Sequence, residues 1–382
     1  MRDAGCQDSR HGFIDRWRRE PLLSTPIMNS EPIFLRACRR LPVARVPVWF
    51  MRQAGRYMPE YRELRARHSI LELCRSPELA TRVTLMPVER FGFDAAIIFA
   101  DLLLPLEGLG VGFHFAKGEG PVIERPVRDR SDIDRLRLFD PAETLGYVMA
   151  AIRSVRAGLP GHVPLIGFAG APFTLASYMI EGGGSRHYVH VKSLMYNDPE
   201  GWTRLMRVVR EMTRDYLAAQ IEAGAQAVQL FDSWVGCLSP ADYRDYVLPH
   251  SRWILDELAG SGAPTIHFGT GTATLLEAMT EAGGDVIGVD WRIPIAEARS
   301  RIGPGFAVQG NLDPALLFAP RQRLLRRVRE ILREAGRHPG YIFNLGHGVL
   351  PGTPVENVAA VVETVHAHPI DATASPGEDV SG

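Results

Sequence analysis

Residues 227–242 read Ala-Val-Gln-Leu-Phe-Asp-Ser-Trp-Val-Gly-Cys-Leu-Ser-Pro-Ala-Asp, and they contain the unit from which the fold can be predicted. The first five residues form a largely apolar run, which is typical of a strand covered on both faces. Ser239 can then cap a helix, Pro240 suits the first helical position, and Asp242 places an acid in the first turn. This stretch therefore predicts a buried strand followed by a helix.

The same unit recurs along the whole chain. Helix starts of the same kind occur at Ser76-Pro77 and at Asp198-Pro199, and the residues after the second keep one helical face apolar. We expect eight strands, at residues 46–51, 95–101, 164–168, 227–231, 265–268, 286–290, 306–309 and 341–345. Strand and helix alternate without a linker or a change in composition. The pattern predicts an α/β fold, a single-domain (β/α)8 TIM barrel with its active-site cleft at the C-terminal ends of the strands.

Composition argues against several classes of protein. Hydrophobic residues make up 46% of the 382, which is enough for a sizeable core, and barrels of this kind commonly form one domain of such length. The net charge of −1 gives no general attraction to nucleic acid or to a membrane surface, so we expect neither as a partner. No apolar run approaches the roughly 20 residues that a membrane-spanning helix needs.

The cysteines and the basic residues carry little functional signal. Cys6, Cys38, Cys74 and Cys237 form neither a close pair nor a zinc-like spacing, which favours a reduced, cytoplasmic location and no metal site. Only two of the 43 basic residues are lysines. We interpret this excess of arginine as a bias of composition.

The two ends of the chain lack the pattern of the barrel. Residues 1–30 are polar, rich in arginine and without an apolar signal core, which predicts a disordered N-terminal extension, with Met28 as an alternative start. Residues 369–382 are expected to be a disordered tail. The barrel is accordingly expected over residues 31–368.

A pair of arginines follows the first expected strand. Arg52 and Arg56 stand four residues apart within residues 47–61, which also contain several aromatic side chains. Arginine presents a rigid fork of N–H donors that matches a carboxylate or a phosphate, and it keeps its charge in proteins. The pair predicts an anion-binding site, although two solvated surface arginines would give the same pattern.

Polar or small residues stand at or just after every expected strand end. They are Arg52, Asp101, Ala171-Pro172, Asp232-Ser233, Gly269, Asp290, Asn311 and His347. In barrels of this kind the functional groups lie at the carboxyl ends of the strands. The sequence therefore predicts that these residues meet at one mouth of the barrel.

Several longer motifs carry a resemblance to a known family. The most specific is Pro-Val-Trp-Phe-Met-Arg-Gln-Ala-Gly-Arg-Tyr-Met-Pro-Glu-Tyr at residues 47–61. Further motifs lie at residues 95–101, 167–175, 177–182, 229–233, 309–314 and 344–348. In order and spacing they resemble the uroporphyrinogen decarboxylase family over roughly residues 32–366.

The resemblance implies a carboxy-lyase of haem biosynthesis. Its substrate would be uroporphyrinogen III, whose four acetate side chains lose their carboxyl groups to give coproporphyrinogen III and 4 CO2. No cofactor is implied, because a protonated pyrrole can accept the electron pair, and the protein's task is positional and electrostatic. The family forms homodimers, so we expect a homodimer here.

The resemblance assigns catalysis to Asp101 and Arg52. Asp101 follows an apolar run and would face the pyrrole N–H groups, where its attraction to a forming cation about 4 Å away is about 4 kcal/mol. Its structural alternatives are to cap the next helix or to pair with an arginine. Arg52 matches a residue that grips substrate carboxylates and is also a candidate general acid. The high pKa of arginine favours anchoring, with donation through a water as the alternative.

The resemblance also assigns substrate binding to Arg52, Arg56, Asp101, Tyr178, Ser233, His347 and Phe231. Tyr178 and Ser233 would donate hydrogen bonds to carboxylates, and His347 would add positive charge near neutral pH. Phe231 would line the pocket. The alternatives are ordinary hydroxyls at the rim, a structural histidine and a phenylalanine that only packs.

Two other functions share this fold. A zinc-dependent methyltransferase acting on corrinoid or thiol substrates would need a His-x-Cys pair and a later cysteine, but the sequence reads His267-Phe268-Gly269 and has no cysteine after Cys237. A tetrapyrrole-binding protein without activity would show decay of the charged set, which is intact. Asp290 and Trp291 also match the family, but they and His267 are left outside the expected site, because a strand-end aspartate often holds a neighbouring loop.

Overall fold

The computed structural model describes residues 31–116, 120–336 and 339–368. The extension expected at residues 1–30 and the tail expected at residues 369–382 lie outside the described residues.

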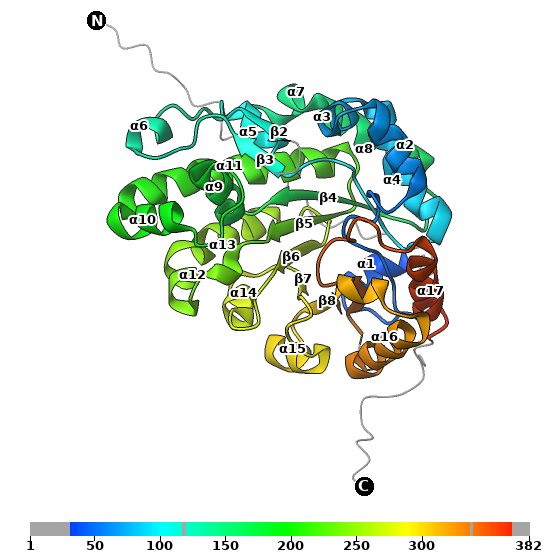
Figure 1. Cartoon of the computed structure of the whole chain (residues 1–382). Helices are drawn as coiled ribbons and strands as arrows, with labels where there is room; N and C mark the ends of the chain where they lie inside the picture. Colours follow the sequence, from blue (N-terminus) through cyan, green and yellow to red (C-terminus); the bar gives the residue numbers. More distant parts are fainter. Residues whose placement is uncertain (1–30, 117–119, 337–338, 369–382) are drawn as a thin grey trace, which may run out of the picture.

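A parallel sheet of seven strands forms the centre of the molecule and curls about a central axis (Figure 1). Its strands lie side by side in chain order: β1 (Ala96–Ile97), β4 (Leu165–Gly170), β5 (Ala227–Asp232), β6 (Thr265–Gly269), β7 (Val286–Gly288), β8 (Ala307–Leu312) and β9 (Tyr341–Leu345). All their pairings are parallel, with Phe231 of β5 opposite Phe268 of β6. The α/β barrel is confirmed, and seven of the expected strands form within it.

The eighth position of the barrel is taken by residues 46–51, which do not form a regular strand. Val48 makes a single parallel bridge to Phe343 of β9. On its other side the Val48 N–H donates to Asp94 Oδ2 (2.8 Å), and the Asp94 N–H donates to the Val48 carbonyl (2.9 Å). Pro47 has no N–H to donate, and a carboxylate replaces a ladder carbonyl. The strand expected here is therefore reduced to one bridge that still closes the ring.

Helices connect the strands and cover the outside of the sheet (Figure 1). They are α1 (Ile33–Cys38), α2 (Pro59–Arg67), α3 (Ile70–Arg75), α4 (Pro77–Phe91), α5 (Leu104–Gly108), α6 (Arg130–Ile133), α7 (Pro141–Thr144), α8 (Gly146–Gly158), α9 (Pro172–Glu181), α10 (Val189–Asn197), α11 (Pro199–Ala223), α12 (Pro240–Tyr246), α13 (Leu248–Leu258), α14 (Leu276–Ala282), α15 (Ile295–Ile302), α16 (Arg321–Ala335) and α17 (Val355–His366), with 3-10 helices at Val235–Cys237 and Pro314–Phe318. Across the described part of the chain, none of these helices has the length and apolar character needed to cross a membrane.

The three expected helix starts are confirmed at α4, α11 and α12. The side chains of Ser76, Asp198 and Ser239 each accept a hydrogen bond from the N–H three residues further on, at 3.3, 3.0 and 3.1 Å. A proline occupies the first turn in all three helices. These caps satisfy N–H groups that a helix leaves unpaired at its start, so each helix begins where the sequence specifies.

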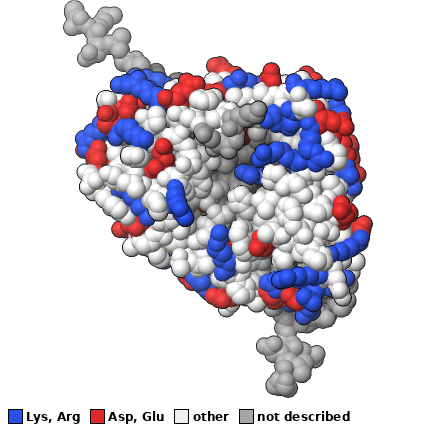
Figure 2. Space-filling view, viewed as in Figure 1, with Lys and Arg blue, Asp and Glu red and all other residues white. Residues whose placement is uncertain are grey.

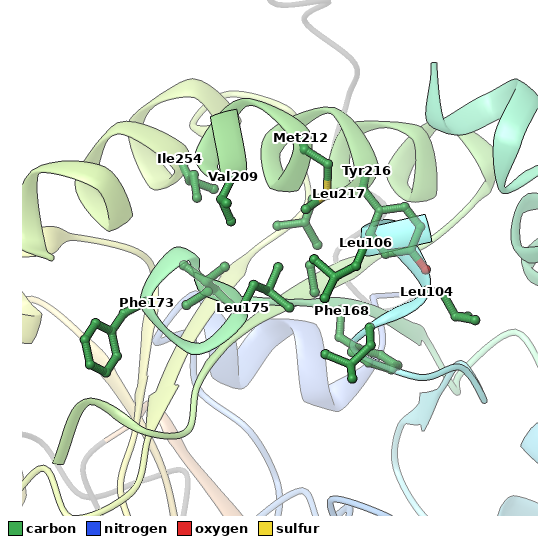
Figure 3. Close-up of a cluster of buried hydrophobic side chains, with 14 of the residues drawn as sticks. Leu104, Leu106, Phe168, Phe173, Leu175, Val209, Met212, Tyr216, Leu217 and Ile254 are labelled. Carbon is green, nitrogen blue, oxygen red and sulfur yellow. The ribbon is translucent and has the colours of Figure 1, made fainter. Parts of the chain in front are cut away.

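The long helix α11 packs its apolar face onto the sheet. Figure 3 shows Val209, Met212 and Leu217 extending from α11 toward Leu175 of α9 and Phe168 of β4. All five side chains are buried. Fully burying an aliphatic side chain of this size contributes about 1.5–3 kcal/mol, so this layer fixes α9 and β4 relative to each other.

A two-stranded antiparallel hairpin lies between β1 and β4 in the chain and was not expected from the sequence. It consists of β2 (Phe113–Ala116) and β3 (Gly120–Ile123). The Ile123 N–H donates to the Gly182 carbonyl (2.8 Å), which ties the hairpin to the end of α9. Strands of four residues give too weak a periodic signal to be recognised by pattern.

Candidate active site

A chain of buried amide groups crosses the interior of the barrel. Trp49 Nε1 donates to Gln309 Oε1 (2.9 Å), and Gln309 Nε2 donates to Gln229 Oε1 (3.0 Å). Gln229 lies on β5 and Gln309 on β8, which are not neighbours in the sheet, so these bonds run through the interior. Residues two apart on a strand face the same side. Phe231 therefore faces the interior one step nearer the carboxyl ends of the strands.

Aromatic rings form the next layer above these amides. The ring of Phe231 meets Phe168 of β4 edge to face, with centroids 5.6 Å apart, and Phe268 of β6 at 5.7 Å. Phe231 is only partly buried, whereas Phe168 and Phe268 are buried. Phe231 thus combines packing with a partly open position beneath the mouth of the barrel.

Arg52 stands in a tight turn directly after the first segment of the barrel. Its φ of +58° lies in the left-handed region, which residues other than glycine rarely adopt. The fully buried Gln53 holds this turn, because its side chain donates to the Ala95 carbonyl (3.2 Å) and accepts from the Phe50 N–H (3.2 Å). Ala95 immediately precedes β1. The turn that carries Arg52 is therefore tied to the strand that leads to Asp101.

The side chain of Arg52 lies across the loop that follows β9. A Cβ atom on Gly348 would lie 2.4 Å from Arg52 Cδ and 2.6 Å from its Cγ, so only glycine leaves room for this path. The Val349 N–H donates to the Met51 carbonyl (2.9 Å) and holds the two backbones together. Arg52 is exposed, which leaves its guanidinium N–H groups accessible to a ligand.

Asp101 follows β1 and has an incompletely paired carboxylate. Its Oδ1 accepts a hydrogen bond from the Leu103 N–H (2.9 Å), and within the described residues its carboxylate has no further hydrogen bond. Surrounding protein removes water from the carboxylate and raises its pKa, while the Leu103 bond and the Arg52 charge act in the opposite direction. The residue still reaches solvent in part. This bond closes a turn before α5, which has no side-chain cap, so Asp101 does not cap the next helix.

Tyr178, on α9, lies near the carboxylate of Asp101. Burial, together with the nearby Asp101 carboxylate, raises the pKa of Tyr178 to about 12, so its hydroxyl is protonated at neutral pH. Its ring stacks on Trp234, with centroids 4.0 Å apart and planes inclined by 34°. Trp234 directly follows Ser233 after β5. The structure therefore brings Tyr178 next to the loop that carries Ser233.

His347 follows β9 and lies near two guanidinium groups. Burial lowers the pKa of His347 to about 4, and the charges of Arg52 and Arg292 act in the same direction. The ring is accordingly neutral near pH 7 when no anion is bound. Burial and two cations both disfavour protonation of the ring, so the positive charge of His347 beside a bound carboxylate stays a prediction. A neutral imidazole can still donate one hydrogen bond.

Arg56 and Ser233 have weaker ties to this group. Arg56 is exposed, and its guanidinium makes no hydrogen bond or ion pair with a described residue. Ser233 is half-buried, and its carbonyl accepts a hydrogen bond from the Thr270 hydroxyl. The charge of Arg52 reaches Asp101, Tyr178 and His347, and Ser233 precedes the Trp234 that stacks on Tyr178. No described contact ties Arg56 to these residues.

This chain is similar to a known family over nearly its whole length. A family model described as Uroporphyrinogen decarboxylase (URO-D) matches residues 29–368. The chain belongs to the uroporphyrinogen decarboxylase family. A relative named uroporphyrinogen decarboxylase from Sorangium cellulosum is 61% identical over 88% of this chain and 96% of its own length. One of the same name from Carboxydothermus hydrogenoformans is 57% identical over 87% and 95%.

Solved structures with other names show the same fold at low identity. A methyltransferase from Methanosarcina mazei superposes with a TM-score of 0.70 at 22% identity, covering 87% of this chain and 97% of its own. A B12-independent methionine synthase from Shewanella sp. W3-18-1 gives 0.50 at 12% identity, covering 89% and 98%. At such identities the likeness concerns the arrangement of strands and helices and not the chemistry.

The zinc ligands of the alternative methyltransferase are not assembled in this family member. His267 is fully buried on β6, with its Nε2 3.5 Å from Asp232 Oδ2, and the position two residues later is Gly269 instead of cysteine. Over residues 31–116, 120–336 and 339–368, no three His, Cys, Asp or Glu side chains form a group that could hold a metal ion. This donor set does not fit a zinc ion.

Asp290 holds a neighbouring loop, as the sequence-based interpretation allowed. Its Oδ2 accepts from the Gly271 N–H (2.6 Å), its Oδ1 accepts from the Arg292 N–H (3.0 Å), and the side chain is buried. Its guanidinium partner is Arg292.

Sequence reasoning overlooked two residues near the expected site of this decarboxylase fold. Trp234 stacks on Tyr178, and the charge of Arg292 reaches His347. Trp234 stands one residue after Ser233 and Arg292 two residues after Asp290, and this position close behind a strand end was the available signal.

Two cavities of the molecule lie away from the residues of the expected site. One cavity of about 490 Å³ lies between α6 and α10, and another of about 190 Å³ lies beside Asp94; none of the expected site residues lines either. Figure 2 shows one face of the molecule hollowed near its centre, with basic side chains beside the hollow. An open hollow suits a large, flexible ligand better than a small enclosed one.

Proposed function

We propose that this chain decarboxylates uroporphyrinogen III and acts as a carboxy-lyase of haem biosynthesis. Each of the four acetate side chains loses its carboxyl group, and the product is coproporphyrinogen III. Relatives that carry the family's name at 52–61% identity support this assignment. The structural observation behind it is the open carboxylate of Asp101 beside Arg52 and Tyr178.

The reaction needs an acceptor for the electron pair of the C–C bond that breaks. Protonation of the pyrrole carbon next to the one that bears the acetate gives a cationic ring. Its iminium group is conjugated with the acetate-bearing carbon, so the ring takes up the pair as CO2 leaves and an exocyclic methylene forms. A second proton then adds to the exocyclic carbon, which becomes a methyl group, and the first proton is released. The substrate supplies its own electron sink, so we propose that no metal or organic cofactor takes part.

Asp101 is proposed to stabilise the cationic ring. Its unpaired oxygen would accept pyrrole N–H groups, and several such bonds would bend the macrocycle around the carboxylate. At about 4 Å and an effective dielectric near 20, the attraction to the ring is about 4 kcal/mol. Because the positive charge exists only after protonation, this attraction favours the transition state over the ground state and gives about 10³ in rate.

Arg52 is proposed to anchor substrate carboxylates and to balance charge. A guanidinium with a pKa above 12 is a costly proton donor, and one clamped on the reacting acetate would stabilise the ground state. Arg52 therefore holds a side chain that does not react, and the proton comes from a water held near it. Its left-handed backbone and the room above Gly348 fix the direction of this anchor.

The other binding residues are proposed to hold the remaining carboxylates and the ring. Tyr178 and Ser233 donate hydroxyl hydrogen bonds, and Arg56 meets a carboxylate at the outer edge of the mouth. His347 donates a hydrogen bond as a neutral imidazole and gains charge only once a carboxylate sits beside it. Phe231 lines the floor below the macrocycle.

An activity assay tests the proposal directly. Purified protein, without added metal, is incubated with chemically reduced uroporphyrin III under anaerobic conditions, and the oxidised products are separated by chromatography. We expect hepta-, hexa-, penta- and tetracarboxylates to appear in turn. Unchanged octacarboxylate, under conditions in which a related decarboxylase is active, would reject the function.

We further propose that the enzyme is a cytoplasmic homodimer without nucleic-acid or membrane partners. Family resemblance, the net charge of −1 and the lack of paired cysteines support this assignment. Sedimentation equilibrium at micromolar concentration should give twice the chain mass of 42.3 kDa, and a monomer mass would contradict the dimer.

A further inference from the structure

The loop after β7 places a third guanidinium at the mouth of the barrel. Val289, Asp290 and Trp291 lead from β7 to Arg292. The loop is held at both ends by Asn311 of β8, whose Nδ2 donates to the carbonyls of Asp290 (3.0 Å) and Ile293 (2.7 Å). Arg292 therefore sits on a rigid support at the carboxyl end of the sheet.

This loop packs tightly against the loop that carries His347. A Cβ atom on Gly346 would lie 2.7 Å from the Trp291 backbone nitrogen and 2.9 Å from Asp290 Cα. Trp291 Cε3 also lies 2.7 Å from that position, so both the backbone and the ring of Trp291 pack against Gly346. The guanidinium charges of Arg292 and Arg52 both reach the His347 ring. Arg292 consequently belongs to the same electrostatic neighbourhood as the proposed anchor Arg52.

The guanidinium of Arg292 has a fixed orientation, but most of its N–H donors have no hydrogen-bond partner among the described residues. Its carbon lies 4.4 Å from the centroid of the Trp291 ring, which fixes the plane of the group. One of its five N–H groups donates to Asp290 Oδ2, no other partner occurs among the described residues, and 51% of the side chain is exposed.

Asp290 offsets this cation only in part, although its charge acts against those of Arg52 and Arg292 at His347. Its buried carboxylate also accepts the Gly271 and Arg292 backbone N–H groups, so its negative charge is shared among three donors and points away from solvent. The outer edge of the guanidinium is left facing outward. Such an edge matches a carboxylate in a two-bond arrangement.

We propose that Arg292 is a further substrate-binding residue, which holds one peripheral carboxylate of the tetrapyrrole on the side of the mouth formed by the β7 and β9 loops. This inference depends on the proposed function for the identity of the ligand. Arg292 touches a carboxylate that does not react, so it governs affinity and not the chemical step. The carboxylate belongs either to a propionate or to an acetate, and these two sources can be separated experimentally.

The test compares Arg292→Gln with Arg301→Gln. Arg301 on α15 is also paired with a carboxylate, that of Glu277, but lies on the outer ring of helices, so it controls for the loss of one paired arginine. We expect Arg292→Gln to raise KM for uroporphyrinogen about tenfold, the worth of a charged hydrogen bond, with kcat within about twofold. Arg301→Gln should leave both constants unchanged.

Binding of the stable oxidised porphyrins identifies the side chain. Uroporphyrin has four acetates and four propionates, whereas coproporphyrin keeps only the propionates, and the binding of both can be followed by fluorescence. Equal weakening of both by Arg292→Gln assigns a propionate to Arg292. Weakening of uroporphyrin alone assigns an acetate. Unchanged binding of both, or a fall in kcat with unchanged KM, overturns the proposal and leaves Arg292 as a holder of its loop.

Arg292→Lys covers the case in which the glutamine variant folds poorly. Lysine keeps the charge and can still pair with Asp290, but it lacks the two-bond fork, so binding should weaken about threefold with an unchanged Tm. Wild-type affinity in a folded lysine variant and a folded glutamine variant would also overturn the proposal. If the wild-type protein fails to decarboxylate, the proposed function fails first, whereas an active wild type with an indifferent Arg292 rejects only this inference.

Discussion

Two aspartates flank β1, and they differ in almost every respect except their chemistry. Asp94, at the amino end, accepts hydrogen bonds from both terminal nitrogens of Arg45 (2.8 and 2.5 Å) and from the Val48 N–H (2.8 Å), and it contacts His366 Nε2 (3.0 Å). Burial raises the pKa of Asp94, but these partners outweigh it and the net shift is downward. Asp101, at the carboxyl end, has one backbone donor and a raised pKa.

The difference shows how one strand can carry structure at one end and chemistry at the other. A fully paired carboxylate contributes to folding, because its interactions are complete before any ligand arrives. An under-paired carboxylate in a desolvated site costs stability and keeps its acceptor oxygens for a ligand. Asp94 closes the ring of the barrel, whereas the carboxylate of Asp101 keeps unpaired acceptor capacity.

The largest expected effect comes from Asp101→Asn. The amide removes the negative charge from the forming cation, so we expect kcat to fall about 10³-fold. Stability should not fall, because a desolvated charge disappears at the same time. Steady-state kinetics and thermal unfolding check the two expectations. A variant that decarboxylates at a rate near that of the wild type would show that Asp101 does not stabilise the ring.

Asp94→Asn should have the reverse outcome. Loss of the charged partner of Arg45 in a buried site should reduce the free energy of unfolding by about 3 kcal/mol, while kcat of the folded enzyme stays near that of the wild type. Urea denaturation measures the change, and Asp256→Asn, an exposed aspartate, is the control. A large loss of kcat without loss of stability would contradict the structural role assigned to Asp94.

Gly348→Ala tests how Arg52 is aimed. The added Cβ meets only the side chain of Arg52, so the backbone stays intact while the guanidinium is pushed aside. We expect kcat/KM to fall at least tenfold, since small misplacements of anchoring groups are costly. Gly161→Ala, where the added atom meets open space, should behave as the wild type. Equal kcat/KM values for the two variants would show that activity does not depend on the position of the Arg52 side chain over Gly348.

The two aspartates also predict that stability and activity are lost at different pH values on acidification. The lowered pKa of folded Asp94 means that its stabilisation is complete above the unfolded value of about 3.9 and is lost as pH falls through the folded pKa. The raised pKa of Asp101 means that its charge, and with it kcat, is lost at a higher pH. Activity should therefore decline on acidification before the protein unfolds. Coincident loss in pH-rate and circular dichroism profiles would contradict this order.

The smallest expected effect is that of Arg56→Ala. Arg56 is exposed, so its carboxylate contact is partly screened by water, and we expect KM to rise about threefold with little change in kcat or Tm. Titration of initial rates against substrate concentration measures this change. Saturation behaviour identical to that of the wild type would remove Arg56 from the binding site.

The agreement between expected and observed strand limits depends on how the backbone of each segment is hydrogen-bonded. Continuous apolar runs such as residues 227–231 and 341–345 became strands with nearly the expected limits, because burial on both faces leaves a clear pattern. Residues 95–101 kept only two strand residues, because the Phe99 N–H donates instead to the Thr84 hydroxyl on α4 (2.9 Å). A side chain far away in the sequence had taken the place of a ladder carbonyl.

The candidate site likewise contains features that the sequence predicts and features that depend on the tertiary structure. Arg52, Asp101, Tyr178 and His347 were recognisable from motifs, and their convergence followed from the barrel. The neutral state of His347 was not recognisable, since it depends on burial and on two guanidinium groups brought in from other loops. Trp234 and Arg292 were missed for the same reason, because neither is distinctive until its neighbours are known.

The sequence by itself determined the succession of strands and helices, the caps that start the helices, and the family to which the chain belongs. These depend on periodicity and on local hydrogen bonds, which are properties of neighbouring residues. Only the tertiary structure decided which aspartate is satisfied and which is left open. Desolvation and charge act through space, and the partners of Asp94, which are Arg45, Val48 and His366, come from both ends of the described chain.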